Sequence, residues 1–179
     1  KYNIYRKSFD PETKTFGPAE LVLDADTLGK SATLPRISPD GRYLLFGMAE
    51  YGCFHIWHKD ADLYMIDLKN MAMRNMRELN SDDVESYHSW SSNGRWILYT
   101  SRRDDGGYTR LYIAYFDKNG RAHKPFILPQ RDPYFYEDYF KSYNVPEYML
   151  EPVTITPQEF ARHIDKPALP VTFKSLSTK

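Results

Sequence analysis

The sequence lacks three features that would assign its class at once. It has one cysteine, Cys53, among 179 residues, so neither an internal disulfide nor a cysteine-based zinc site can form. No apolar run approaches the roughly 20 residues that a membrane-spanning helix needs. The 24 Lys and Arg residues balance the 24 Asp and Glu residues, which removes the electrostatic signature of a nucleic-acid-binding protein.

Catalytic and targeting motifs are also missing. The sequence has no Gly-x-Ser-x-Gly elbow, so we do not expect it to hold the catalytic domain of a serine hydrolase. It begins at Lys1 with neither an initiator Met nor a signal sequence, which we interpret as a processed product or a fragment. What the sequence has in abundance is aromatic residues, at 16% with 15 Tyr, a composition that favours strands.

The most informative feature is a stretch that occurs twice. Residues 33–46 recur without a gap as residues 86–99, a shift of 53 positions. The Ser-Pro-Asp-Gly and Ser-Ser-Asn-Gly segments inside the two copies predict tight turns between paired antiparallel strands. A repeat of about this length built from short strands is typical of propeller blades. The matched positions include Ser38 with Ser91, Gly41 with Gly94, Arg42 with Arg95 and Leu45 with Leu98.

The repeat predicts an all-β fold, a partial β-propeller whose blades are four-stranded antiparallel sheets. Residues 3–10 match residues 110–117 at a shift of 107, about twice the shift between the two copies. We therefore predict propeller blades over residues 1–130 and a C-terminal extension with short helices over 131–179. The expected parts are a half blade at 1–24 and full blades at 33–79 and 86–128, with strands of the first full blade at 33–38, 42–48, 62–68 and 73–79.

The two copies resemble the repeat of the TolB-type β-propellers. The residues that carry the resemblance are Ile37-Ser38-Pro39-Asp40-Gly41-Arg42 with Asp62-Leu63-Tyr64-Met65-Ile66-Asp67, and Ser89 to Trp96 with Leu111-Tyr112-Ile113. The second copy departs from the pattern at Asn93, which replaces Asp in the turn. The resemblance implies a periplasmic protein of the bacterial cell envelope that binds other envelope proteins, although no signal sequence is present in this chain.

Two and a half blades do not close a ring, because radial propellers contain about four to eight. We therefore expect that missing blades, or other copies of the chain, complete the propeller.

Two segments of the extension predict helices. Asp132 and Pro133 are suited to begin one, with Tyr136, Tyr139, Phe140 and Tyr143 following at helical spacing. Thr156-Pro157-Gln158-Glu159 is a capping box that predicts a short helix to about Ile164. Val171-Thr172-Phe173 is a further candidate strand. The aromatic segment at residues 134–140 is suited either to dock a partner or to pack against the chain's own last blade.

The segment 55–62 contains the best candidates for ligand contact. His55 and His58 lie three residues apart with carboxylates nearby, a pattern that can ligate a divalent metal ion. The alternative is that the loop packs down on its aromatic residues while the histidines face solvent. Trp57, in the same irregular loop, is a candidate contact for a ligand or partner.

A second candidate site precedes the innermost strand of the second full blade. Asp82, Asp83 and Glu85 are followed by Tyr87 and His88, and His88 occupies the position of Pro35 in the first copy. Together they are candidates for an acidic channel mouth that binds a cation or a basic peptide. The alternative is a solvated acidic turn with His88 hydrogen-bonded inside the blade.

We predict a non-catalytic scaffold that binds a protein or peptide partner through propeller loops and the channel rim. One alternative is a metal-dependent, carbohydrate-active enzyme similar to the lyases with TolB-like propellers, and it would bring a carbohydrate ligand. The other is an accessory propeller domain of a larger hydrolase. No catalytic residue is assigned, and a divalent metal is the one cofactor considered.

Overall fold

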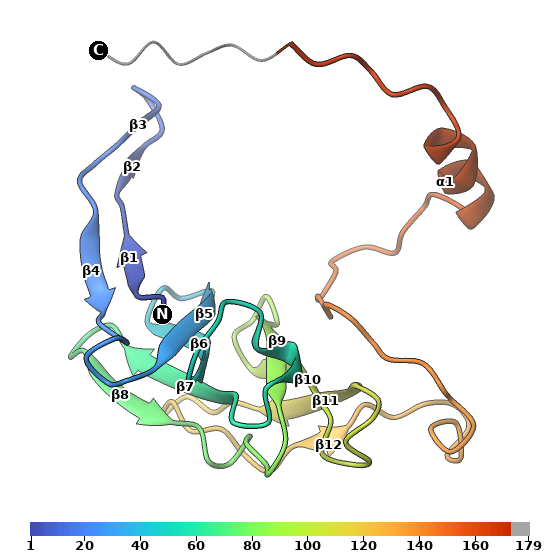
Figure 1. Ribbon diagram of the computed structural model, residues 1–179, viewed down its shortest axis with the longest axis horizontal. Helices are drawn as coiled ribbons and strands as arrows, with labels where there is room; N and C mark the ends of the chain where they lie inside the picture. Colours follow the sequence, from blue (N-terminus) through green and yellow to red (C-terminus); the bar gives the residue numbers. More distant parts are fainter. Residues whose placement is uncertain (173–179) are drawn as a thin grey trace. The chain divides into compact units, whose positions relative to one another are not determined.

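The computed structural model describes residues 1–172 and divides the chain into two compact units, Lys1–Tyr148 and Met149–Lys179. The first unit contains two four-stranded antiparallel sheets whose strands follow one another in chain order (Figure 1). Blade 1 comprises β5 (Ser31–Ile37), β6 (Tyr43–Ala49), β7 (Asp62–Asp67) and β8 (Ala72–Asn75). Blade 2 comprises β9 (Glu85–Trp90), β10 (Trp96–Ser101), β11 (Arg110–Tyr115) and β12 (Phe126–Ile127).

These sheets confirm the predicted fold class, with strands close to their expected positions. The outer strands are shorter than expected, because β8 ends at Asn75 rather than at residue 79. The Met76 carbonyl accepts hydrogen bonds from the backbone N–H groups of Leu79 and Asn80, at 2.7 and 3.1 Å. This turn withdraws the following residues from the sheet.

The N-terminal segment forms a smaller sheet. In it, β1 (Ile4–Arg6) pairs with β4 (Glu20–Leu23), and the intervening β2 (Phe9–Asp10) and β3 (Thr15–Phe16) form a separate hairpin. The Ala32 N–H donates to the Tyr2 carbonyl at 2.9 Å, which links this segment to blade 1. The described sheets do not close into a ring.

Blade 1 is buried on both faces because its residues alternate between two cores. Leu45 and Met65 belong to a cluster shared with Tyr99 of blade 2, whereas Phe46 belongs to a cluster shared with Ile4 of the N-terminal segment. Every residue of β6 is buried. A strand that is apolar on both faces fits a sheet packed between two neighbours.

The expected helix after Asp132 is absent, and this prediction was wrong. Residues 131–148, which we call the strap, form turns and extended chain that contact blade 2. The Tyr136 hydroxyl donates to the Leu128 carbonyl at 2.8 Å, and the Arg110 guanidinium donates to the Lys141 carbonyl at 2.9 Å. The Asp132 carboxylate accepts from the Tyr134 N–H and closes a turn instead of capping a helix.

The second helix prediction is confirmed by α1 (Pro157–Ile164). The Thr156 hydroxyl accepts from the Glu159 N–H at 3.2 Å, while the Glu159 carboxylate accepts from the Thr156 N–H at 2.8 Å. Val171 and Thr172 lie outside any strand, and Phe173 lies outside the described residues. Within residues 1–172, no helix has the length and apolar character needed to cross a membrane.

Candidate functional site

The long connection between β6 and β7 is held in place by side chains of β5. The Ser31 hydroxyl donates to the Gly52 carbonyl at 2.5 Å, and the Thr33 hydroxyl donates to the Cys53 carbonyl at 2.6 Å. The loop then forms a 3-10 turn, η1 (His55–Trp57). Its backbone is therefore fixed to blade 1 although it carries large exposed side chains.

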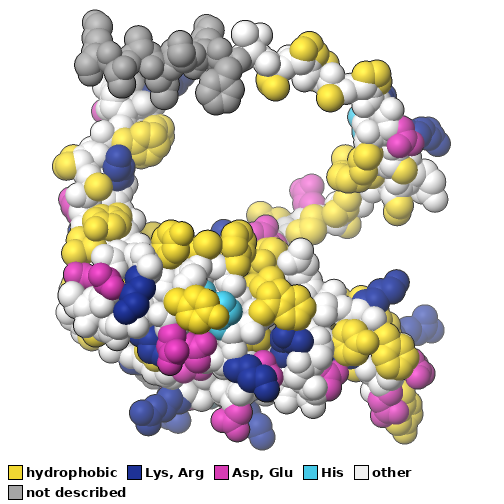
Figure 2. Space-filling view, in the orientation of Figure 1, with side chains coloured by type: hydrophobic (Ala, Val, Ile, Leu, Met, Phe, Trp, Pro, Cys, Tyr) yellow, Lys and Arg dark blue, Asp and Glu magenta, His cyan; other side chains and the backbone are white. Residues whose placement is uncertain are grey.

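Those exposed side chains are aromatic. Tyr51, Phe54 and Trp57 are 64%, 69% and 63% exposed. In Figure 2, hydrophobic side chains and a histidine gather where Figure 1 places the connection between β6 and β7. An anchored backbone with exposed aromatic side chains is typical of a binding surface, because little conformational entropy remains to be lost when a partner binds.

Trp57 and Tyr87, two of the predicted site residues, meet at one cavity. This aromatic pocket has a volume of about 330 Å³. Its wall combines the η1 segment, the inner strand of blade 2, Thr109 just before β11, and the strap. The lining residues are Ile56, Trp57, Tyr87, Thr109, Ser142, Tyr143 and Asn144.

Tyr87 reaches this pocket from a distorted strand. Its φ of +47° is left-handed, a conformation that costs a non-glycine residue roughly 1–2 kcal/mol. The register of β9 against β10 shifts at this point, which marks a β-bulge. Leu34, the equivalent residue of blade 1, has a φ of +52° at the corresponding shift. Bulges redirect side chains, and strained residues of this kind are enriched at functional sites.

Two groups hold the walls of the aromatic pocket. The Arg102 guanidinium lies 4.3 Å from the centroid of the Trp57 ring, a cation–π contact that limits the motion of the indole. Opposite, the Thr109 carbonyl accepts from the Tyr143 N–H at 3.1 Å, which fixes the strap to the start of β11. The pocket therefore needs four segments that are separate in the sequence.

The structure places Glu85 inside blade 2 rather than at a rim. Its carboxylate accepts hydrogen bonds from the hydroxyls of Ser81 and Ser101, at 2.6 and 2.7 Å. It also forms an ion pair with the Arg103 guanidinium at 2.9 Å. Burial raises the pKa of Glu85, against the opposing effect of these donors. The residue thus connects a loop to the neighbouring strands.

His88 is also interior. Its Nε2–H donates to the Leu45 carbonyl at 3.0 Å, because a carbonyl oxygen can only accept, and this contact ties β9 to blade 1. Its Nδ1 is buried without a partner among the described residues. Burial lowers the pKa of His88 to about 4. His88 is therefore a neutral residue between the blades at ordinary pH.

Asp82 and Asp83 remain near the surface. Asp82 is exposed, and Asp83 is half-buried. The backbone N–H of Val84 donates to the Asp83 carboxylate at 2.8 Å. Both line a shallow cavity with Arg102 and Arg103. Of the predicted acidic group, these two residues are the ones that the structure leaves open to solvent.

His55 and His58 are neighbours, with ring centroids 5.5 Å apart. His55 is buried, its Nε2 lies 2.7 Å from the Gly52 carbonyl, and burial lowers its pKa. The Nδ1 atoms of both rings are buried without a hydrogen-bond partner within residues 1–172. Over the same residues, no group of three or more His, Cys, Asp or Glu side chains could hold a metal ion.

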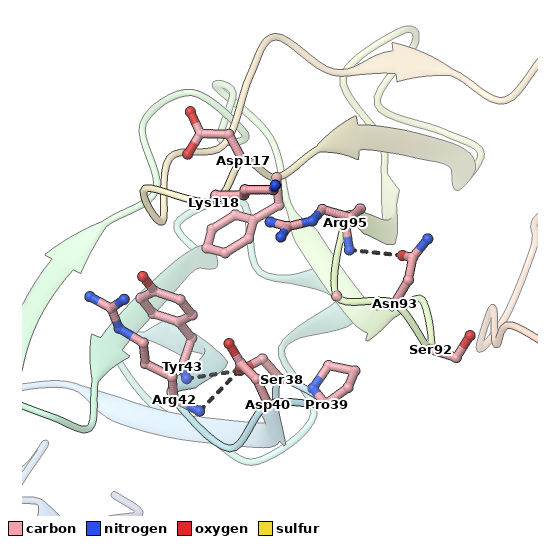
Figure 3. Close-up of a pocket in the computed structure, with 12 residues that line it drawn as sticks. Ser38, Pro39, Asp40, Arg42, Tyr43, Ser92, Asn93, Arg95, Asp117 and Lys118 are labelled. Carbon is pink, nitrogen blue, oxygen red and sulfur yellow. Dashed lines mark hydrogen bonds between the residues drawn. The ribbon is translucent and has the colours of Figure 1, made fainter.

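A third cavity, which the sequence reasoning missed, lies between the turns of the two blades (Figure 3). This hairpin pocket has a volume of about 330 Å³ and includes the β5–β6 turn, the β9–β10 turn and the turn after β11. Because each strand reverses direction, these turns lie at the opposite end of the blades from the β6–β7 connection. Its charged lining residues are Asp40, Arg42, Arg95, Asp117 and Lys118.

The two carboxylates of the hairpin pocket are engaged in their own turns. The Ser38 hydroxyl, which donates to Asp40 at 2.6 Å, lowers the pKa of that carboxyl. The Arg121 N–H, which donates to Asp117 at 3.0 Å, lowers the pKa of the second carboxyl. Both side chains are therefore ionised and directed into backbone hydrogen bonds.

No family model matches the sequence, and no curated protein matches it. Solved structures with a similar fold include the β-propeller domain of the Trilobed protease from Pyrococcus furiosus, at 16% identity and a TM-score of 0.41. They also include TolB from Acinetobacter baumannii, at 22% identity and a TM-score of 0.42. An acylaminoacyl peptidase from Pyrococcus horikoshii matches at 16% identity and a TM-score of 0.39. TolB, whose repeat the sequence resembles, is thus among them.

The matches cover most of this chain but a minor part of each matched structure. They span 71%, 68% and 71% of the present chain, in the same order. They span 39%, 29% and 23% of the matched chains, so this chain covers well under half the length of each.

Proposed function

We propose that the chain is a non-catalytic binding module that takes an extended peptide of a partner protein into the aromatic pocket. The observation that carries the proposal is the meeting of Trp57, Tyr87 and Tyr143, from three segments, around one open cavity. Aromatic residues in such pockets supply most of the energy of protein–protein binding. The anchored β6–β7 connection keeps the pocket formed before the partner arrives.

The expected ligand is a linear peptide with a large apolar side chain. That side chain would enter the cavity between the indole and the two phenol rings. The exposed Tyr51 and Phe54 next to the pocket supply further apolar contact for the flanking peptide residues. We propose that this module acts in the periplasm, at the bacterial cell envelope. The TolB-type repeat supports this proposal.

A displayed library of random linear peptides, selected on the whole chain, tests this proposal. Recovered peptides should share an apolar anchor, and Trp57→Ala should weaken their affinity by about 30-fold, the loss of a hot spot of about 2 kcal/mol. Phe16→Ala is the matched control, because Phe16 is 69% exposed, like Phe54, but lies in the β2–β3 hairpin. Peptides that bind the Trp57 variant as tightly as the native chain would refute the proposal.

We also infer that additional blades complete the ring, supplied by a longer chain or by other copies. The support is the β1–β4 sheet, which has two strands where each blade has four. Light scattering on the whole 21.1 kDa chain tests the second source. A stable mass of several chains would favour copies, and a monomer would exclude them.

Divalent-metal binding is a second candidate function, and the carbohydrate-active alternative depends on it. The observation in its favour is the pair of neighbouring imidazoles, His55 and His58, whose buried Nδ1 atoms lack hydrogen-bond partners within residues 1–172. Titration with Zn²⁺ should show one site that both His55→Ala and His58→Ala remove. Zn²⁺ binding that survives both substitutions, or no binding to the native chain, would exclude this candidate.

A further inference from the structure

The two hairpin turns are built in the same way, so a difference between them is informative. Ser38 donates to Asp40 at 2.6 Å, and Ser91 donates to Asn93 at 2.8 Å. The Arg42 N–H donates to Asp40 at 3.1 Å, just as the Arg95 N–H donates to Asn93 at 3.0 Å. Arg42 and Arg95 therefore leave equivalent turns at equivalent positions.

The two guanidinium groups nevertheless have different surroundings. In blade 1, Arg42 binds the Asp67 carboxylate through Nη2 at 2.8 Å and Nε at 3.2 Å. Asp67 pairs with Tyr43 across the sheet, and the residue in the same place in blade 2, opposite Trp96, is Tyr115. Blade 2 thus has a phenol where blade 1 has the carboxylate.

Arg95 is left without a carboxylate partner as a result. No hydrogen bond or ion pair engages its guanidinium within residues 1–172, and the same holds for the ammonium of Lys118. Figure 3 shows both side chains on the blade 2 side of the hairpin pocket, where Asp117 also lies, with Asp40 on the blade 1 side. The two carboxylates that share this pocket, Asp40 and Asp117, accept hydrogen bonds within their own turns, so the two cations remain available to an added anion.

We propose that the hairpin pocket binds an oxyanion, a carboxylate or a phosphate group of a small polar ligand, through Arg95 and Lys118. The guanidinium fork matches two oxygens of such a group, and the ammonium adds a point charge. Asn93 and Ser92 also line the pocket and can bind neighbouring polar atoms of the ligand. This site lies at the opposite end of the blades from the aromatic pocket and is independent of the peptide proposal.

Anion titrations followed by NMR test the site directly on the whole chain. Inorganic phosphate and acetate are added separately at constant ionic strength, and the Nε–H resonances of arginine side chains are recorded. The Arg95 resonance should shift and saturate with at least one of the two anions. The anion that binds more tightly identifies the ligand as a phosphate or a carboxylate.

Three variants separate a built site from general electrostatic attraction. Arg95→Gln should lower the affinity for the anion by about tenfold or more, because it removes a charge-assisted contact. Lys118→Gln should weaken it by a smaller factor. Arg77→Gln is the matched control, since Arg77 is an exposed arginine outside the pocket, and it should leave the affinity unchanged.

Tyr115→Asp is the sharpest variant, because it removes no cation. It places in blade 2 a carboxylate equivalent to the one that pairs with Arg42 in blade 1. Arg95 should pair with this carboxylate, and the affinity for the anion should fall by about tenfold. Normal folding of this variant is checked by its unfolding midpoint. An Arg95 resonance that neither anion shifts, or equal affinities for native chain, Arg95→Gln and Arg77→Gln, would overturn the proposal.

Discussion

The two ends of the blades differ in how faithfully they repeat. At the hairpin end, Ser38 and Ser91 accept from the N–H groups of Tyr43 and Trp96 at the same distance, 2.9 Å. At the loop end, the β6–β7 connection carries the aromatic residues of a pocket, whereas the β10–β11 connection is a short charged turn. Repetition maintains the sheets, and the departures from it create the candidate sites.

The same lesson applies position by position along the inner strands. Glu85 of blade 2 occupies the place of Ala32 in blade 1, and both residues are buried. His88 likewise occupies the place of Pro35. At these two positions blade 1 has residues that need no hydrogen-bond partner, whereas blade 2 has residues that depend on one. Substitutions at these positions should therefore lower stability more in blade 2 than in blade 1.

The largest effect is expected from Glu85→Ala, which gives blade 2 the residue of blade 1. We expect a loss of about 3–5 kcal/mol in the free energy of unfolding, because Arg103 would remain partly buried without its carboxylate. Denaturant unfolding measures the change. Asp82→Ala, an exposed acid three residues away, should change it by less than about 0.5 kcal/mol.

A second substitution sharpens this result. Replacing Arg103 by Leu in the Glu85→Ala background should recover part of the lost stability, because the two effects share one interaction. Strictly additive losses would show that the ion pair is not what holds the loop to the blade.

The next largest effect is a pH dependence that blade 1 lacks at the same position. The pKa of His88 is lowered from 6.5 to about 4 in the fold. Between these values the unfolded chain binds a proton and the folded chain does not, so stability falls as the pH drops from about 6.5 to 4. The expected loss from this group is about 3 kcal/mol.

The contribution of His88 is isolated by comparison with His88→Gln, which retains a hydrogen-bond donor for the Leu45 carbonyl. The difference between the two unfolding free energies should change over that pH range and be constant above pH 7. Parallel curves for the two proteins would mean that His88 does not titrate differently in the folded and unfolded states.

A third prediction compares two glycines in left-handed conformations. Gly41 has a φ of +74° with open space at its Cα, whereas Gly120 has a φ of +80° and packs against the Tyr43 hydroxyl. Gly41→Ala should cost about 1–2 kcal/mol from backbone strain alone. Gly120→Ala should cost about 1–3 kcal/mol more, because the new methyl group overlaps that hydroxyl.

Tyr43→Phe tests the cause of this difference. The Tyr43 hydroxyl is buried without a hydrogen-bond partner within the described residues, so its removal alone should cost little. In the Tyr43→Phe background, the cost of Gly120→Ala should fall but stay above that of Gly41→Ala, because the ring carbon Cζ would still lie 2.8 Å from the new methyl carbon. Equal costs in both backgrounds would contradict the packing explanation.

The sequence predicted the parts of the fold that local patterns determine. The turn residues and the repeat located both blades, and the capping box at Thr156 located α1. The helix expected after Asp132 failed because Arg110 and Leu128 of blade 2 bind strap groups, which a local pattern does not reveal. Tertiary contacts outweighed the helical spacing of the tyrosines.

The candidate sites were predicted only in part, for a similar reason. Trp57 and Tyr87 were named from the sequence, but their meeting with Tyr143 depends on the path of the strap. The hairpin pocket was missed although the sequence contains its signal. Once the strands are aligned, Asp67 of the first copy corresponds to Tyr115 of the second, and that exchange leaves Arg95 unpaired by any described residue.

The smallest expected effect compares the two arginines themselves. Arg42→Ala should lower the unfolding midpoint slightly, because it breaks the exposed pair with Asp67, whereas Arg95→Ala should leave the midpoint unchanged. Arg42 lowers the pKa of Asp67 below 3.8, so the pair contributes stability above that pH and loses it as the pH falls further. The midpoints of the native chain and Arg42→Ala, measured by thermal unfolding, should therefore converge in acid. A midpoint lowered equally by both substitutions at neutral pH would mean that Arg95 has a structural partner after all, and the two hairpins would then be equivalent.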